Sequence, residues 1–373
     1  MAAVSIDDLG GRLASAYPEL DSVRAAAGDT PVYVVGGAVR DLLLGRGRAD
    51  LDLVVVGDAA TLAPRLGADV TQHERFATAK VRLGEHEVDV ATARTERYPR
   101  PGALPEVEPA AGIEEDLARR DFTVNAMAVP LSGEPGLIDP HGGRADLEAR
   151  LLRVLHPRSF ADDPTRALRA ARYASRFGFA LEPGTEALLR EADLSTVSAE
   201  RRDAELLRLA GEESAPRGFE LLGEWGLVEP RAGGLELASR VGGLLARPPW
   251  QGLVPPDRAL LVAALGPEGG EEALAAAEPD RPSEAVRLAR AHDPVELVLA
   301  RALGAEWLDR FVTEWDTVRL EIDGGDLIAA GAEQGPALGR GLAAALRRKL
   351  DGEIGGREEE LAAALAAARE GER

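Results

Sequence analysis

Asp50 and Asp52 are the first residues whose types and spacing could do chemistry. Asp50-Leu51-Asp52-Leu53 opens an apolar run typical of a β-strand, in which residues i and i+2 point to the same face. The two carboxylates should therefore converge while Leu51 and Leu53 enter the core. Such paired oxygen ligands suit Mg²⁺, with a nucleoside triphosphate completing the coordination shell. The alternative for an isolated Asp-x-Asp is a solvated strand face.

A glycine pair, Gly36-Gly37, follows a short apolar segment and ends thirteen residues before Asp50. Glycines after a strand let the backbone approach a phosphate, and the N-terminus of a following helix attracts anions. With Arg40 three residues further on, this spacing favours a nucleotide site over a simple turn. Asp89, on a neighbouring predicted strand, could be a third metal ligand, and an exposed hairpin residue is an equally good account of it.

A second set of residues, Arg120, Asp121 and Asn125, lies in the segment 114–129, which the sequence predicts to be helical. On a helix residues i and i+4 are neighbours, so Asp121 and Asn125 would share a face. An arginine beside such a pair can hold a triphosphate and a ribose hydroxyl. A surface salt-bridge cluster is the plainer alternative.

A third set begins at Asp163, a natural helix N-cap, and continues with Arg166, Arg169 and Arg172. These arginines and Arg176 should lie along one side of a helix, where they could line a phosphate site, although such a stripe usually marks a solvated face. Asp163 offers only acceptors and Arg166 only donors. Cytosine and adenine present an amino donor beside a ring-nitrogen acceptor and fit this pair, whereas uracil and guanine do not.

The elements that must position these residues are predicted to be α/β in the N-terminal part. Apolar runs bounded by glycine predict strands, the Gly84-Glu85 turn predicts a hairpin, and four prolines with a glycine predict a loop. In chain order we expect strands at 32–35 and 51–56, a hairpin at 79–92, a loop at 98–109 and a helix at 114–129. After residue 163 the pattern is helical throughout, divided by a proline-rich segment at 247–256.

Composition excludes several classes of protein. The 373 residues carry 64 acidic and 44 basic side chains, a formal net charge of -20, and no cysteine. The lack of cysteine excludes disulfides, thiol catalysis and Cys-ligated zinc. No apolar run is long enough to span a membrane and no signal peptide is visible, so we expect a cytoplasmic protein with no membrane partner. The acidity taken alone argues against a protein that coats nucleic acid.

The charge is unevenly distributed along the chain. Residues 1–183 carry 28 acidic and 22 basic side chains, a net of -6, which leaves -14 for residues 184–373. Between residues 144 and 176 eight arginines accompany four acidic residues, and this is the one strongly positive stretch. An acidic average can therefore hide a local positive groove, and the local field governs the approach of a charged partner.

In this order the motifs resemble those of the class II tRNA nucleotidyltransferase / bacterial poly(A) polymerase family, best known from CCA-adding enzymes. The resemblance covers about residues 32–209. It rests on Gly-Gly-Ala-Val-Arg-Asp with Asp50-x-Asp52, and on Arg-Arg-Asp-Phe-Thr-Val-Asn-Ala-Met at 119–127. Residues 139–147 resemble the family's flexible hinge motif, and Ser198-Ala-Glu-Arg201 with Glu205 resembles its neck motif. The family's Glu-Asp-x-x-Arg appears here as Asp-Asp-x-x-Arg, which leaves only the role of Asp162 open.

The resemblance implies a fold, domains and site residues. The fold would be α/β plus all-α: a nucleotidyltransferase (polymerase β-like) head at 1–155, a helical neck for base recognition at 156–215, and a helical body and tail for tRNA binding at 216–373. Asp50 and Asp52 would be the catalytic residues that hold two Mg²⁺ ions, with Asp89 possible. The nucleotide-binding residues would be Gly36, Gly37, Arg40, Arg120, Asp121, Asn125, Asp163, Arg166, Arg169 and Arg172.

The implied activity is template-independent addition of the 3′-terminal CCA (C and/or A) to tRNA from CTP and ATP, by two-metal-ion nucleotidyl transfer with release of pyrophosphate. A-adding, CC-adding and poly(A)-polymerising members share these motifs and stay open; segment 94–109, where the family's specificity loop lies, favours complete CCA addition. An inactive nucleotide- or RNA-binding module is the alternative of another class, against which the intact Asp50, Asp52 and Arg166 argue. An HD phosphohydrolase domain is not expected, because only His292 follows residue 156.

Overall fold

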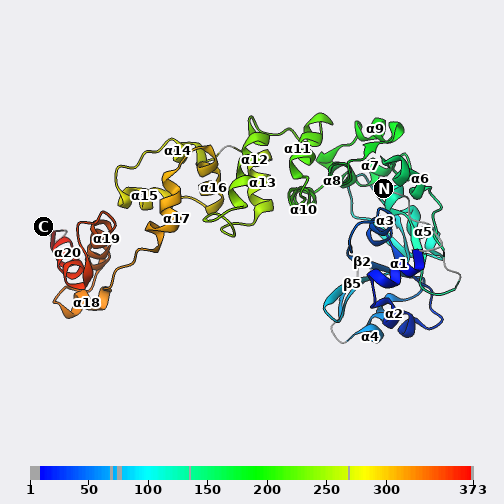
Figure 1. Cartoon of the computed structure of the whole chain (residues 1–373), viewed down its shortest axis with the longest axis horizontal. Coiled ribbons are helices and arrows are strands. Elements are labelled where there is room, and N and C mark those ends of the chain that lie inside the picture. The colour runs from blue at the N-terminus through cyan, green and yellow to red at the C-terminus, as the bar shows by residue number, and fades with distance from the viewer. Residues whose placement is uncertain (1–8, 68–69, 74–77, 134–135, 268, 371–373) are drawn as a thin grey trace. The chain divides into compact units, whose positions relative to one another are not determined.

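The computed structural model describes the chain apart from residues 1–8, 68–69, 74–77, 134–135, 268 and 371–373. It divides into two compact units, Met1–Val228 and Glu229–Arg373 (Figure 1). The first unit combines a mixed sheet with helices, and the described part of the second contains only helices as regular elements. This arrangement confirms the predicted fold class. The finer division at 155 and 215 stays a prediction.

The predicted strands belong to one mixed sheet of the first unit. Among the described residues its strand order is β3-β4-β5-β2-β1-β8, and neighbours are antiparallel except for the parallel pair β2 and β5. The bounds are β1 Val32–Val35, β2 Leu51–Val55, β3 Val70–His73, β4 Thr78–Leu83, β5 His86–Thr92 and β8 Ala128–Pro130. The two predicted strands and the predicted hairpin are confirmed.

The register of β2 decides which side chains face the site. Asp52 pairs with Val35 of β1 and with Asp89 of β5, and directly paired residues point to the same side of a sheet. Leu51 and Leu53 point to the other side and are buried. The predicted alternation along this strand is therefore confirmed.

An apolar cluster supports the Asp52 face of the sheet. Val35 and Val54 pack there against Ile113 and Leu117 of helix α5, Ile113–Ala118. This packing places α5, and the residues that directly follow it, beside β1 and β2.

Two predicted elements are wrong. The single helix expected over 114–129 is divided into α5, a 3-10 turn η3 at Thr123–Asn125 and strand β8. The helix cannot continue because Phe122 is extended and bridges Val154, and because β8 joins the sheet beside β1. The loop expected over 98–109 is in part a ribbon, since β7 Glu106–Pro109 pairs with β6 Arg94–Arg97.

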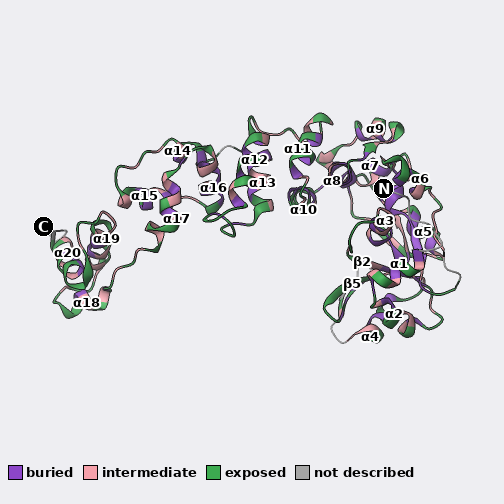
Figure 2. Ribbon diagram, in the orientation of Figure 1, coloured by how far each residue is buried: buried purple, intermediate pink, exposed green. Residues whose placement is uncertain are grey.

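Helices complete the first unit, and α8 is the one that positions the predicted arginines. It is mostly buried (Figure 2) and packs against α10 and α11. The helices other than α5 are α1 Leu9–Ala16, α2 Leu20–Ala27, α3 Gly37–Leu43, α4 Ala59–Leu66, α6 Gly143–Ala149, α7 Ser159–Asp162, α8 Thr165–Phe177, α9 Pro183–Leu189, α10 Ala199–Ala210 and α11 Ala215–Glu224. Two short strands, β9 Leu151–Leu152 and β10 Ala180–Leu181, pair in parallel, and a 3-10 turn η4 spans Leu194–Thr196.

The second unit is a succession of helices. They are α12 Gly234–Leu245, α13 Pro256–Leu265, α14 Glu271–Ala275, α15 Pro282–Ala289, α16 Pro294–Leu303, α17 Trp307–Thr313, α18 Gly324–Ala329, α19 Pro336–Leu350 and α20 Gly356–Glu370, with a 3-10 turn η5 Trp315–Thr317. The proline-rich segment at 247–256 joins α12 to α13, which pack against each other, so it is a connection inside this unit. In the described residues no helix combines the length and apolar character that a membrane crossing needs.

Candidate functional site

The residues predicted from the sequence gather around one cavity of about 1560 Å³ in the first unit. Its lining contains every one of them: Gly36, Gly37, Arg40, Asp50, Asp52, Asp89, Arg120, Asp121, Asn125, Asp163, Arg166, Arg169 and Arg172. Asp52 and Asp89 lie on strands of the sheet and Asn125 lies on η3. The other acidic residues precede β2, η3 and α8, and α8 supplies most of the arginines. The sequence therefore predicted which side chains meet, although they come from five separate segments.

Asp50 and Asp52 form the acidic part of the cavity. Neither carboxylate accepts a hydrogen bond from the described residues. Burial raises the pKa of Asp52 to about 6, opposed by the positive charge of Arg120 and reinforced by the charges of Asp89 and Asp50. Asp89 lies on the same face but is half-exposed, with its carboxylate 3.5 Å from Lys80 Nζ. Asp52 is thus a partly buried carboxylate whose ionised form an added cation would stabilise.

The glycine pair brings backbone close to this acidic part. Gly36 has φ +66°, and a Cβ there would lie 2.9 Å from Arg120 Nη1. Helix α3 begins at Gly37, as predicted, and places Arg40 at the cavity wall. Arg40 is buried and donates hydrogen bonds to Asp41 Oδ1 and Asn125 Oδ1. Arg40 is therefore held in place by two polar partners.

Asp116, which sequence reasoning missed, fixes Arg120. It is fully buried and accepts hydrogen bonds from Arg119 Nε and Nη2 and from Arg120 Nε and Nη2, the closest at 2.7 and 2.9 Å. Burial acts to raise the pKa of Asp116, but the charges of Arg120 and Arg119 lower it. The signal in the sequence was an acid three and four residues before two arginines at the end of a helix.

Asp121 and Asn125 meet without sharing a helix. Asn125 Nδ2 donates to Asp121 Oδ1 at 2.9 Å, and Arg169 Nε and Nη2 donate to Asp121 Oδ2 at 2.9 and 2.7 Å. Burial acts to raise the pKa of Asp121, but the charge of Arg169 and these hydrogen bonds lower it to about 2. The predicted proximity is confirmed, while its predicted cause is wrong.

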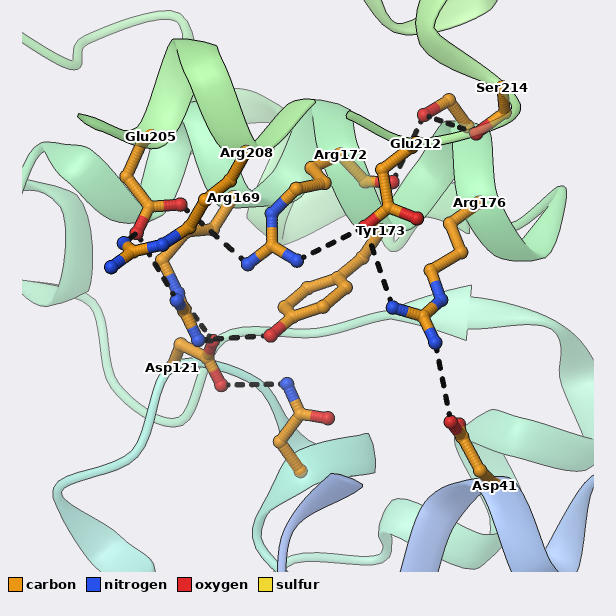
Figure 3. A network of polar contacts seen from close by, with 12 residues as sticks. Asp41, Asp121, Arg169, Arg172, Tyr173, Arg176, Glu205, Arg208, Glu212 and Ser214 are labelled. Atoms are coloured by element: carbon orange, nitrogen blue, oxygen red, sulfur yellow. Dashed lines mark hydrogen bonds and ion pairs between the residues drawn. The ribbon is translucent and has the colours of Figure 1, made fainter. Parts of the chain in front are cut away.

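The arginines of α8 are not a free stripe on a solvated face. Figure 3 shows Arg169, Arg172 and Arg176 paired with acidic side chains around Tyr173, whose hydroxyl accepts from Arg169 Nη2 at 3.0 Å. Contacts of at most 3.6 Å close a ring through Arg40, Asp41, Arg176, Glu212, Arg172, Glu205, Arg169, Asp121 and Asn125. Two atoms in this ring, Arg172 Nε and Glu205 Oε2, are buried without a hydrogen-bond partner.

Asp163 is bonded asymmetrically. Its Oδ1 accepts from Thr165 N at 3.1 Å, Thr165 Oγ1 at 2.6 Å and Arg201 Nη2 at 2.8 Å, whereas its Oδ2 accepts no hydrogen bond from the described residues. Arg166 is buried, and it donates through Nη1 to Ser159 Oγ at 2.8 Å and through Nη2 to the Arg119 carbonyl at 2.7 Å. These bonds fix both side chains at the cavity wall while leaving Oδ2 of Asp163 free.

Other residues at the cavity were missed or left without a role. Arg201 and Glu205 were part of a recognised motif but were not predicted as site residues. Tyr98 lies in the segment expected to be a loop, and Glu96 lies on β6 just before it. Tyr98 donates its hydroxyl hydrogen bond to Glu96 Oε2 at 2.9 Å. Asp162 is paired with Arg158 at 2.9 Å. No local pattern marks Tyr98, because its position depends on the pairing of β6 with β7.

Comparisons with known proteins agree with this geometry. The family model of the poly A polymerase head domain matches residues 32–153. An A-adding tRNA nucleotidyltransferase from Aquifex aeolicus is 51% identical over 166 residues, which cover 43% of this chain and 20% of that protein. A solved structure of a CCA-adding enzyme in complex with CTP aligns with 98% of this chain and along 99% of its own chain, with a TM-score of 0.75 and 28% sequence identity.

One relative aligns along nearly its whole length. The first three curated relatives are matched over only 20%, 19% and 48% of their own lengths. In contrast, a CC-adding tRNA nucleotidyltransferase from Deinococcus radiodurans is 35% identical over 361 residues, which cover 91% of this chain and 90% of that protein. By this similarity over both chains, the protein belongs to the tRNA nucleotidyltransferase family.

Proposed function

We propose that this protein is a nucleotidyltransferase that builds the CCA end of tRNA from CTP and ATP without a nucleic-acid template. The observation that carries the proposal is the pair Asp163 and Arg166 in the same cavity as Asp50 and Asp52. Asp163 Oδ2 would accept a hydrogen bond from the amino group of cytosine or adenine, and Arg166 would donate to the adjacent ring nitrogen. Uracil and guanine would present an acceptor to a carboxylate and a donor to a guanidinium.

The arginines support this proposal because they suit a triphosphate. Arg169 and Arg172 lie on α8 beside Arg40 and Arg120, and guanidinium groups bind phosphate oxygens in a bidentate fashion. Arg172 Nε, buried and without a partner, would gain a phosphate acceptor. Asp121 and Asn125 would orient Arg169 and Arg40 and receive the ribose hydroxyl.

Asp50 and Asp52 fit a pair of magnesium ions. Both are acceptor-only side chains, with Asp52 on β2 and Asp50 directly before that strand. Neither receives a donor from the described residues, and the part-buried Asp52 lies close to the negative charges of Asp89 and Asp50. In the part of the chain that the structure describes, no group of three or more His, Cys, Asp or Glu is arranged to hold a metal ion, so phosphate and water oxygens would complete the shell. When bound, such ions activate a 3′-hydroxyl and stabilise charge on the leaving pyrophosphate.

Incorporation of labelled CTP and ATP into tRNA lacking its CCA end tests the activity. Wild-type protein with Mg²⁺ should incorporate both labels, and Asp52→Asn should lose nearly all incorporation because a neutral amide is a poor ligand for a hard cation. Asp89→Asn is the matched control, and a loss no larger than a few-fold is expected because Asp89 is half-exposed and faces Lys80. No incorporation by the wild type rejects the proposal, and full activity of Asp52→Asn rejects the metal assignment.

CC addition is the second candidate, favoured by the Deinococcus radiodurans relative. Sequencing the 3′ ends made from tRNA, tRNA-C and tRNA-CC separates the two: complete CCA addition extends all three to CCA, whereas CC addition leaves tRNA-CC unchanged. Extension of tRNA-CC alone would indicate A addition, and long A tails a poly(A) polymerase. Binding of tRNA by the helical second unit and a cytoplasmic location stay predictions.

A further inference from the structure

The loop between β6 and β7, residues 98–105, is fastened beside the candidate base-reading residues. The Gly102 N–H donates to the Asp162 carbonyl at 3.3 Å, and the Gly102 carbonyl accepts from Arg201 Nη1 at 2.8 Å. The other terminal nitrogen of Arg201 bonds Asp163. Gly102 has φ +69°, and a Cβ there would collide with the Thr196 carbonyl, so only glycine fits this close approach. One arginine thus ties the loop to Asp163.

This fastened loop carries an aromatic ring into the cavity. Tyr98 is half-buried and lines the cavity together with Asp163 and Arg166. Its hydroxyl donates to Glu96 Oε2 at 2.9 Å, and Glu96 Oε1 accepts from Arg119 Nη1 at 2.8 Å. Burial and the charge of Glu96 raise the pKa of Tyr98, so the phenol stays a donor. The ring is therefore anchored at its polar end and leaves a face for contact.

The ring lies next to the guanidinium that would read a base edge. Arg166 Cζ is 6.0 Å from the Tyr98 ring centroid, and Arg166 is itself fixed by Ser159 and the Arg119 carbonyl. A base whose edge meets Arg166 and Asp163 needs a surface for its face, since edge hydrogen bonds alone leave the base plane unsupported. Aromatic side chains give such support to any base, because every base has a π-face.

We propose that Tyr98 is a base-binding residue, whose ring stacks on the base of the incoming nucleoside triphosphate while Asp163 and Arg166 read its edge. This inference rests on the proposed function and adds a residue to its binding site. Stacking does not discriminate between bases, so Tyr98 would contribute equally to CTP and ATP. Selection between amino- and carbonyl-bearing bases would stay with Asp163 and Arg166.

Calorimetric titration of the full chain with CTP, ATP and inorganic tripolyphosphate, without RNA, tests this role. Loss of a stacking ring reduces affinity by about 5- to 150-fold per base, so Tyr98→Ala should raise the Kd for CTP and ATP within that range. Its Kd for tripolyphosphate, which has no base, should equal that of the wild type. Tyr98→Phe keeps the ring and loses only the bond to Glu96, so it should bind all three ligands nearly as the wild type does.

Three results would overturn the inference. Unchanged binding of CTP and ATP by Tyr98→Ala would show that the ring does not support the base of an incoming nucleotide. An equal loss of tripolyphosphate binding would assign Tyr98 a purely structural role. Unchanged nucleotide binding with a raised KM for tRNA would place the terminal base of the RNA on the ring. A wild-type chain that binds neither CTP nor ATP would instead refute the proposed function, so the two failures are distinguishable.

Discussion

The ion pair between the buried Asp121 and the part-buried Arg169 gives a prediction whose size can be worked out from the structure. Substituting Asp121→Asn keeps the shape of the side chain and removes its charge. The carboxylate joins the turn before η3 to α8, because Arg169 donates two hydrogen bonds to its Oδ2. The variant therefore leaves a part-buried guanidinium with only Glu205 among the described acidic side chains, at 3.5 Å, to balance it.

The magnitude follows from the pKa of Asp121, which is lowered from 3.8 to about 2. A lowered pKa means that the folded state favours the charged form, and this difference corresponds to about 2.5 kcal/mol at neutral pH. Because the folded pKa is the lower one, this contribution is complete above about pH 4 and is lost as the pH falls toward 2. Breaking a buried pair costs about 3–5 kcal/mol in other proteins, and Glu205 should keep this case near the lower figure.

Hydrogen exchange of α8 amides at increasing urea measures the opening of the first unit alone. At pH 7 the free energy of opening should be about 2.5 kcal/mol lower in Asp121→Asn than in the wild type, and the difference should shrink steadily below pH 4. Asp203→Asn is the control, since its pair with Arg202 is exposed and should contribute at most about 1 kcal/mol. A difference that stays constant from pH 7 to pH 3, or none at pH 7, would refute the assigned ion pair.

Two further substitutions probe the fastening of the loop to the base-reading carboxylate. Gly102→Ala should weaken CTP binding at least tenfold, because it combines an unfavourable positive φ, about 1–2 kcal/mol, with a collision at the Thr196 carbonyl. Gly84 also has a positive φ, +63°, but a Cβ there meets open space, so Gly84→Ala should leave the Kd for CTP unchanged. An equal loss of CTP binding in both variants would contradict the argument. In Arg201→Lys the lysine cannot bond Asp163 and the Gly102 carbonyl at the same time, so the ratio of kcat/KM for CTP to kcat/KM for UTP should fall roughly tenfold. An unchanged ratio would show that Arg201 does not position Asp163.

Local periodicity in the sequence was enough to predict the acidic residues of the site. Alternation along a strand depends only on neighbouring residues, so the orientation of Asp52 opposite to Leu51 and Leu53 followed directly from the pattern. The start of α3 at Gly37 and the hairpin at Gly84 were predictable for the same reason. In each case, residues only a few positions apart decide the geometry.

Features that depend on distant partners could not be predicted. Arg169 and Arg172 reach Glu205 and Glu212 on a later part of the chain, 36 and 40 residues away, so their pairing leaves no local signal. The prediction of one helix over 114–129 was wrong because β8 pairs with β1, which lies almost a hundred residues earlier in the chain. In the same way the pairing of β6 with β7, which positions Tyr98, depends on the tertiary context of a proline-rich segment.

The asymmetric bonding of Asp163 bears on chemical damage to nucleotides. Hydrolytic deamination converts CTP to UTP and ATP to ITP, and each conversion replaces an amino group by a carbonyl and protonates the adjacent ring nitrogen. With Oδ1 occupied by Thr165 and Arg201, the single open oxygen of Asp163 would distinguish an intact base from its deaminated product. The geometry that accepts both a pyrimidine and a purine would thus also reject the damaged form of each.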